Sequence, residues 1–350
     1  MKPNVKQIFI PLLVLVLGAC SSSPKSAPPR FAGSSFSLRG ATSEELEQAL
    51  ADADRASSAG LRTKEDRQAY ATATERAVAL WLSLSEAKSR SQPMAAGDLY
   101  RLESSWPKNL KFDDLIPANT IKGKHLKRRI IREGVGVPFV AHWDYTPERK
   151  AAEHFMTDGG YLTSVTATFD FRRVGNGPRI ASLRLHDSRV VENVRLSGRE
   201  LPLAADLTAY GEYLMSNKDV QMAGLKALLR SSEHMDKLGL IALEHPAQDR
   251  IPLVLVHGLM SRPATWENVI NELGGDPIIQ KHYQIYLFRY PSGVPIIYSS
   301  AKLREELGKL HATLEKQDAR KLCHHMVLIG HSMGGLVSKA QVQDSGDQLW

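Results

Sequence analysis

Apolar residues recur at helical spacing near the start of the patterned part of the chain. Thr42 and Glu45 have the spacing of a capping box, and apolar residues follow at helical intervals from Leu46 to Ala53. A second segment begins near Thr63, with an apolar stripe at Tyr70, Ala73, Ala77, Leu80, Trp81 and Leu84. This pattern predicts a helical hairpin over residues 42–92.

The hydrophobic period changes in residues 95–245. The stretch YLTSVTATFDF, residues 161–171, alternates between apolar and polar positions, which predicts a strand with one face in contact with water. A second strand is predicted for RIASLRLHD, residues 179–187, and helices are predicted over 204–215 and 219–230. Residues 95–245 are therefore expected to form a mixed, β-rich α+β region.

A regular alternation of strands and helices begins after Arg250. IPLVLVHGL is a continuous apolar run, which is typical of a parallel strand buried on both faces. It is followed by a helical segment, TWENVINELGGD, a strand, YQIYLFRYP, a long helix from about Ser299 to Glu315, a strand, HMVLIG, and a helix from Met333. Short joins between these elements predict an α/β fold over residues 250–350, with a parallel sheet covered by helices.

The stretch GHSMGG joins the last predicted strand to the last predicted helix. Gly330, Ser332 and Gly334 match the G-x-S-x-G pattern of a nucleophile elbow, in which the serine occupies a strained turn. Glycine is needed at the flanking positions because the strand and the helix approach closely there and side chains would collide. The N-terminus of the helix directs N–H groups and positive potential at a developing oxyanion. The pattern thus indicates a nucleophilic serine.

The first residues have the plan of an export signal. Two lysines precede an apolar run at residues 8–17, which is too short for a stable membrane span, and small residues then precede Cys20. The ending LGAC resembles the lipobox of bacterial lipoproteins, which implies that residues 1–20 are a signal peptide and that Cys20 is acylated; an ordinary signal with a chance cysteine is the alternative.

Residues 21–41, rich in Ser, Pro, Ala and Gly, are expected to be a flexible tether. Ser21 and Ser22 lack the aspartate that often retains lipoproteins in the inner membrane, so we expect a lipid anchor on the periplasmic side of the outer membrane.

The net charge and the remaining histidines and cysteine do not indicate a further catalytic or metal site. The net charge of +7 is more consistent with anionic lipid than with nucleic acid, given the export signal. The densest basic cluster, KGKHLKRRIIR at residues 122–132, is expected either to contact phospholipid head groups or to be a solvated strand or helix face. The middle region has scattered histidines and no CxxC, so we expect no metal and no cofactor. Cys323 is expected to be a small buried residue without a disulfide partner.

Residues 250–350 resemble the first half of an α/β-hydrolase domain of the bacterial lipase or esterase type. VHGLMSRPATW, YPSGVPIIYSSAKLREEL and GHSMGGLVSKAQVQDSGDQLW together resemble a group of bacterial α/β-hydrolase lipoproteins. The resemblance implies that Ser332 is the nucleophile and that the backbone N–H groups of Leu259 and Met333 form the oxyanion hole. It also implies a membrane-anchored serine esterase or lipase that acts on lipid or acyl esters through an acyl-enzyme, without a cofactor.

The acid and the base of a triad follow the nucleophile in this family. Residues 333–350 contain Asp344 and Asp347 but no histidine, and a regular helix would put Asp344 about 18 Å from the elbow. Of the upstream histidines, only His257 is expected near the serine, and its expected role is to order the oxyanion loop by hydrogen bonds. We therefore predict an incomplete hydrolase, cut short after the elbow, which is weakly active or inactive as this chain and leaves an apolar sheet edge bare.

A second hypothesis comes from a different class of protein. In it the chain is a non-catalytic envelope lipoprotein whose region 42–245 binds a partner while the hydrolase part is inert. Thioesterases, acyltransferases and some amidases also use this elbow, so the sequence leaves the substrate open. A fluorophosphonate probe separates the two hypotheses, because labelling of Ser332 requires an activated serine.

Overall fold

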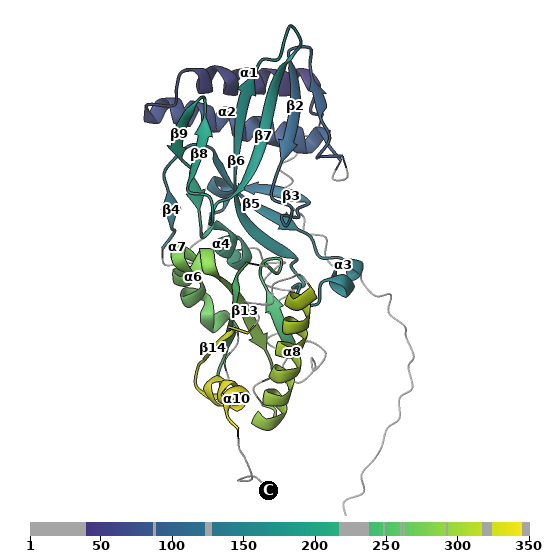
Figure 1. Cartoon of the computed structure of the whole chain (residues 1–350), viewed down its shortest axis with the longest axis vertical. Coiled ribbons are helices and arrows are strands. Elements are labelled where there is room, and N and C mark those ends of the chain that lie inside the picture. The colour runs from purple at the N-terminus through teal and green to yellow at the C-terminus, as the bar shows by residue number, and fades with distance from the viewer. Residues whose placement is uncertain are drawn as a thin grey trace, which may run out of the picture.

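A computed structural model describes the chain over residues 40–86, 89–122, 128–216, 238–247, 249–259, 261, 263–291, 293–316 and 324–344. Figure 1 shows that the N-terminal helices lie at one end of the long axis and helix α10 at the other. Four predicted features lie outside the described residues: the signal with Cys20, the tether up to residue 39, the helix over 219–230, and Cys323. Within the described ranges, none of the helices has the length and apolar character needed to cross a membrane.

The predicted helical hairpin is confirmed as α1 (Ser43–Ser58) and α2 (Lys64–Leu84). The Thr42 hydroxyl accepts from the Glu45 backbone N–H at 3.2 Å, and the Thr42 N–H donates to the Glu45 carboxylate at 3.1 Å. Thr63 and Asp66 form the same reciprocal pair at the start of α2. Both helices therefore begin where side chains satisfy N–H groups that have no partner inside the helix.

The hairpin packs on a six-stranded sheet of order β1-β2-β7-β6-β5-β3, in which only β2 and β7 run parallel. Leu46 of α1, Trp81 of α2 and Phe169 of β6 belong to one apolar core. The hairpin and this sheet therefore share a single core (Figure 1). The strands are β1 (Met94–Ala96), β2 (Tyr100–Ser105), β3 (Asp114–Pro117), β5 (Val137–Trp143), β6 (Tyr161–Arg172) and β7 (Arg179–Asp187).

The prediction of a water-exposed face on β6 is wrong. Thr166 and Thr168 are buried, although they lie on the polar side of the alternating pattern. The Thr166 hydroxyl shares a hydrogen bond with the Ser188 hydroxyl at 2.8 Å and donates to the Ala204 carbonyl at 2.6 Å. Segments that follow β7 thus cover this face and supply partners for the Thr166 hydroxyl, whereas the buried Ser164 hydroxyl has no hydrogen-bond partner among the described residues.

Short elements surround the six-stranded sheet. Arg129 donates to the carbonyls of Ala118 and Ile121 and pairs with Asp206, and Arg132 donates to three carbonyls near β7 and β10. These two arginines of the predicted basic cluster are half-buried and stabilise the fold through these contacts. The elements are η1 (Ala118–Thr120), β4 (Ile131–Arg132), α3 (Pro147–Ala152), β8 (Asn193–Leu196), β9 (Arg199–Pro202), β10 (Ala205–Asp206) and α4 (Ala209–Ser216); β4 pairs with β10, and β8 with β9.

A second sheet of order β11-β13-β12-β14 holds the strands predicted after Arg250. The parallel pairs β12–β13 and β12–β14 agree with the predicted α/β alternation. Strand β11 lies in the region predicted as mixed and runs antiparallel to β13, so the sheet as a whole is mixed. The elements are β11 (Gly239–Ala242), β12 (Ile251–Val256), η3 (Pro263–Trp266), α6 (Glu267–Gly275), α7 (Pro277–His282), β13 (Tyr283–Arg289), α8 (Ile296–Lys316), β14 (Val327–Gly330) and α10 (Met333–Val342).

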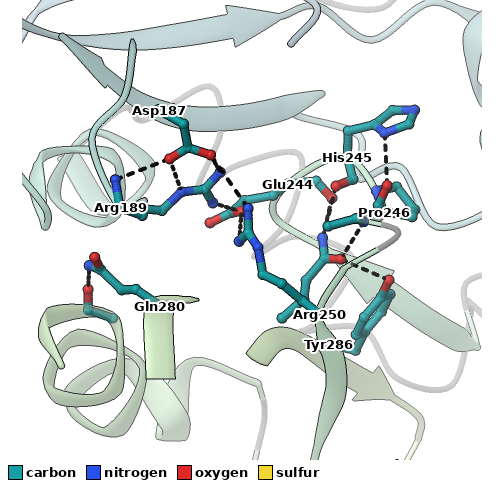
Figure 2. A network of polar contacts seen from close by, with 11 residues as sticks. Asp187, Arg189, Glu244, His245, Pro246, Arg250, Gln280 and Tyr286 are labelled. Atoms are coloured by element: carbon teal, nitrogen blue, oxygen red, sulfur yellow. Dashed lines mark hydrogen bonds and ion pairs between the residues drawn. The ribbon is translucent and has the colours of Figure 1, made fainter. Parts of the chain in front are cut away.

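A buried ionic cluster joins the two sheets (Figure 2). Asp187 and Arg189 come from the end of β7, Glu244 follows β11, and Arg250 precedes β12. Arg189 contacts Asp187 at 2.7 Å, Arg250 lies 3.5 Å from Asp187 and 3.2 Å from Glu244, and Arg189 also pairs with Glu244. Burial opposes ionisation of Asp187, but the two guanidinium groups outweigh it and hold the pKa of this carboxyl below its ordinary value. Two cations and two anions thus balance one another at the junction of the sheets.

Candidate active site

Ser332 occupies a strained turn between β14 and α10. Its backbone has φ 55° and ψ −124°, and only Leu61 and Ser197 share a positive φ among the other non-glycine residues of the described ranges. A side chain in this conformation costs of order 1–3 kcal/mol, and such residues are concentrated at functional sites. The turn leaves Ser332 exposed, with the helix directly behind it.

The predicted need for glycine on both sides of the serine is confirmed. A Cβ atom on Gly330 would lie 2.4 Å from the Gly334 carbonyl oxygen, and one on Gly334 would lie 2.2 Å from the Val256 carbonyl oxygen. Both neighbours are backbone atoms, which cannot move aside as a flexible side chain could. The sequence pattern therefore reflects a close approach of β14, α10 and β12.

The loop after β12 lies against the serine. Val256 and Gly330 are partners in the parallel pairing of β12 with β14, and the His331 N–H donates to the Val256 carbonyl at 3.0 Å. A Cβ atom on Gly258 would lie 2.9 Å from the Cβ of Ser332. The structure thus brings the HGL loop and the GHSMG turn together at the carboxyl edge of the sheet, where open α/β sheets bind ligands.

Two N–H groups at this edge make no hydrogen bond to another described residue. The turn uses the N–H of Gly334 for the His331 carbonyl at 2.9 Å and the N–H of Gly335 for the Ser332 carbonyl at 2.8 Å. The N–H groups of Met333 and Leu259 have no hydrogen-bond partner among the residues that the structure describes. Unpaired donors beside a nucleophile are what an oxyanion site requires, and the start of α10 adds the positive end of a helix dipole.

His257 contacts Gly258 of the same loop and Tyr290 after β13. It is buried, its Nδ1 lies 3.1 Å from the Gly258 carbonyl oxygen, and its ring stacks on Tyr290 at 4.4 Å. Burial lowers the pKa of His257, so the ring is neutral at pH 7. This agrees with the loop-ordering role expected from the sequence.

Among the described residues, no histidine is placed as a general base for the serine. Across the described residues, no histidine is hydrogen-bonded to the Ser332 hydroxyl. The neighbouring His331 is exposed and its ring meets Trp266 edge-on at 6.4 Å. The same residues contain no cluster of three or more His, Cys, Asp or Glu side chains that could hold a metal ion.

Comparisons with protein-family models, curated proteins and solved structures find no match. The interpretation of Ser332 therefore depends on its own geometry and surroundings.

Strand β14 is an exposed edge of the second sheet. In the described part of the chain it pairs only with β12, and Val327 and Ile329 are 36% and 37% exposed. Leu336, on the adjoining helix α10, is 56% exposed. The predicted bare apolar edge beside the nucleophile is thus present in the described structure.

Tyr290 is the residue at this site that sequence reasoning missed. It follows β13, and its hydroxyl donates to the carbonyl of His257 at 2.6 Å. The available signal was its place in the chain, because Tyr290 and His257 lie near the carboxyl ends of two predicted parallel strands, YQIYLFRYP and IPLVLVHGL. The carboxyl ends of neighbouring parallel strands lie at the same edge of a sheet.

Proposed function

We propose that the protein is a serine hydrolase of the α/β-hydrolase type, which attacks carboxylic esters of lipids or other acyl groups with the Ser332 hydroxyl. One observation carries the proposal: Ser332 has a strained backbone between β14 and α10 with the HGL loop in contact with it. A non-glycine residue keeps such a conformation only where the surrounding structure imposes it, and a nucleophile elbow is a known reason for doing so.

The strand order supports the same proposal. An α/β-hydrolase sheet places the nucleophile after a central parallel strand, with the loop of the neighbouring strand beside it. Here β12 lies between β13 and β14, and its loop abuts the turn after β14. An antiparallel β11 outside β13 is compatible with this arrangement.

In the proposed reaction, Ser332 attacks the ester carbonyl and the carbonyl oxygen becomes an oxyanion. The N–H groups of Leu259 and Met333 stabilise that charge, and collapse of the intermediate expels the alcohol and leaves an acyl-enzyme, which water then hydrolyses. A base must remove the serine proton, and no described histidine is placed to do so. The described residues alone should therefore give little turnover, and full activity requires an acid and a base outside them.

Lipid anchoring through Cys20 fits this proposal, because an enzyme tethered at a membrane meets lipid esters at high local concentration. The exposed apolar side chains Leu259 and Leu336 near the serine also suit an acyl substrate more than a highly charged one.

A fluorophosphonate probe tests the proposed function. The expected result is slow covalent labelling of Ser332, since no described histidine takes its proton, located by mass spectrometry of the labelled peptide and absent in Ser332→Ala. Hydrolysis of p-nitrophenyl esters is measured in parallel and should be slow in the 350-residue chain. Failure of the folded protein to label would favour the alternative, a non-catalytic envelope lipoprotein that binds a partner through residues 42–245.

A further inference from the structure

Tyr290 lies behind the HGL loop, on the side away from solvent. Its side chain is 5% exposed and stacks between the rings of His257 and Phe288, at 4.4 and 5.1 Å. Its hydroxyl is the donor in the 2.6 Å hydrogen bond to the His257 carbonyl, since a carbonyl oxygen can only accept. Burial raises the pKa of Tyr290 to about 12, so the hydroxyl keeps its proton throughout the neutral range.

The carbonyl of His257 is held from two sides. Besides the Tyr290 hydroxyl, the backbone of Gly334 lies against it, because a Cβ atom on Gly334 would be 2.5 Å from the His257 oxygen. The hydrogen bond therefore fixes the HGL loop to β13, while the close contact fixes it to the first turn of α10.

This arrangement determines the direction of the Leu259 N–H. A peptide group is planar, so the Gly258 carbonyl and the Leu259 N–H belong to one rigid unit. The His257 ring lies 3.1 Å from the Gly258 carbonyl oxygen through Nδ1, and Tyr290 holds that ring by stacking on it. Gly258 has no side chain that would restrict its backbone, so these outside contacts supply the restriction.

We infer that Tyr290 is a positioning residue, whose hydrogen bond to His257 holds the Leu259 N–H in place to stabilise an oxyanion at Ser332. The inference rests on the proposed function. Tyr290 does not reach the reacting atoms itself, and it acts through the loop.

The test compares Tyr290→Phe with Tyr286→Phe. Each substitution removes one hydroxyl from a buried tyrosine of β13 or its end and keeps the ring, but the Tyr286 hydroxyl bonds to the Gln284 side chain at 3.2 Å and not to the loop. Tyr286→Phe therefore reports the general effect of deleting a buried hydroxyl in this region.

Two measurements are made on both variants and on the unaltered protein. Hydrogen exchange of the Ser261 amide, which donates to the Gly258 carbonyl of the loop at 3.3 Å, should become about tenfold faster in Tyr290→Phe and stay unchanged in Tyr286→Phe, since about 1.4 kcal/mol of hydrogen bonding corresponds to a factor of ten. The maximal rate of Ser332 labelling by a fluorophosphonate should fall about tenfold in Tyr290→Phe, while the probe concentration that gives half that rate stays constant. A purely structural role would not separate these two kinetic constants.

Equal exchange and equal labelling in the two variants would overturn the inference. Exchange of the β12 and β13 amides shows whether each variant is folded. If the unaltered protein does not label, the proposed function fails, and exchange of the Ser261 amide still decides whether Tyr290 holds the loop.

Discussion

Gly334, in the first turn of α10, lies directly against the carbonyl oxygen of Val256, the last residue of β12. A Cβ atom on Gly334 would be 2.2 Å from that oxygen, a distance that real side chains do not adopt. The helix that follows the nucleophile is thus packed onto the neighbouring strand backbone to backbone.

Gly334→Ala should destabilise this part of the protein by about 1–3 kcal/mol or more, because α10 must move away from β12 to admit the methyl group. Gly335→Ala is the matched control, since its Cβ would be 3.7 Å from the nearest atom, the Gly330 carbonyl oxygen. The control should be neutral or stabilise the helix by about 0.5–1 kcal/mol. Urea denaturation midpoints compare the two, and a similar midpoint for both variants would refute the close contact.

Much of residues 250–344 could be predicted because the signals are local. A buried strand appears in the sequence as a continuous apolar run. The glycines of GHSMG are needed wherever a nucleophile elbow brings the backbones of a strand and a helix close together. The capping boxes at Thr42 and Thr63 are equally local, because each is complete within four residues.

Other features depend on residues that are distant in the sequence. The hydroxyl of Thr166 is buried because it forms hydrogen bonds with Ser188 and Ala204. The alternating pattern of β6 does not predict these two contacts. The contact of Tyr290 with His257 follows from the register of β12 and β13, in which Val256 is the partner of Phe288. Periodicity gives the faces of a strand, but it does not say what will cover them.

The strain at Ser332 should be measurable by comparing Ser332→Gly with Ser332→Ala. Both variants lack the hydroxyl, but a φ of 55° with ψ −124° is a conformation that glycine adopts freely and alanine does not. Ser332→Gly should therefore be more stable than Ser332→Ala by about 1–3 kcal/mol. At an unstrained position the alanine variant is the more stable by about 0.5–1 kcal/mol. The sign of the stability difference therefore decides whether the backbone at Ser332 is strained.

The ionic cluster between the sheets gives a third prediction. Arg250→Met leaves Arg189 as the only cation of the cluster for Asp187 and Glu244, which are largely buried. Removing one partner from such a network should cost about 3–5 kcal/mol. Thermal or urea unfolding of the variant measures this loss.

Arg172→Met is the control for that substitution. Arg172 pairs with Glu103 at 3.2 Å, but their side chains are 58% and 34% exposed. An exposed pair contributes at most about 1 kcal/mol, so this variant should unfold close to the unaltered protein. Equal effects of the two arginine substitutions would mean that the cluster does not couple the sheets.

His186 should make stability depend on pH. Burial, with a smaller contribution from the charge of Arg184, lowers the pKa of His186 from 6.5 to about 4, and its Nε2 lies 2.9 Å from the Thr168 hydroxyl oxygen. Between these two pKa values the unfolded chain binds a proton that the folded protein does not. The free energy of unfolding should therefore fall as the pH is lowered from about 6.5 towards 4.

His186→Gln isolates this contribution, because glutamine keeps a hydrogen-bonding group beside Thr168 but does not titrate. Urea unfolding at a series of pH values should show a shallower loss of stability in the variant than in the unaltered protein. His325→Gln, at an exposed position, should leave the pH dependence as it is. Parallel curves for the unaltered protein and His186→Gln would show that His186 does not resist protonation in the folded state.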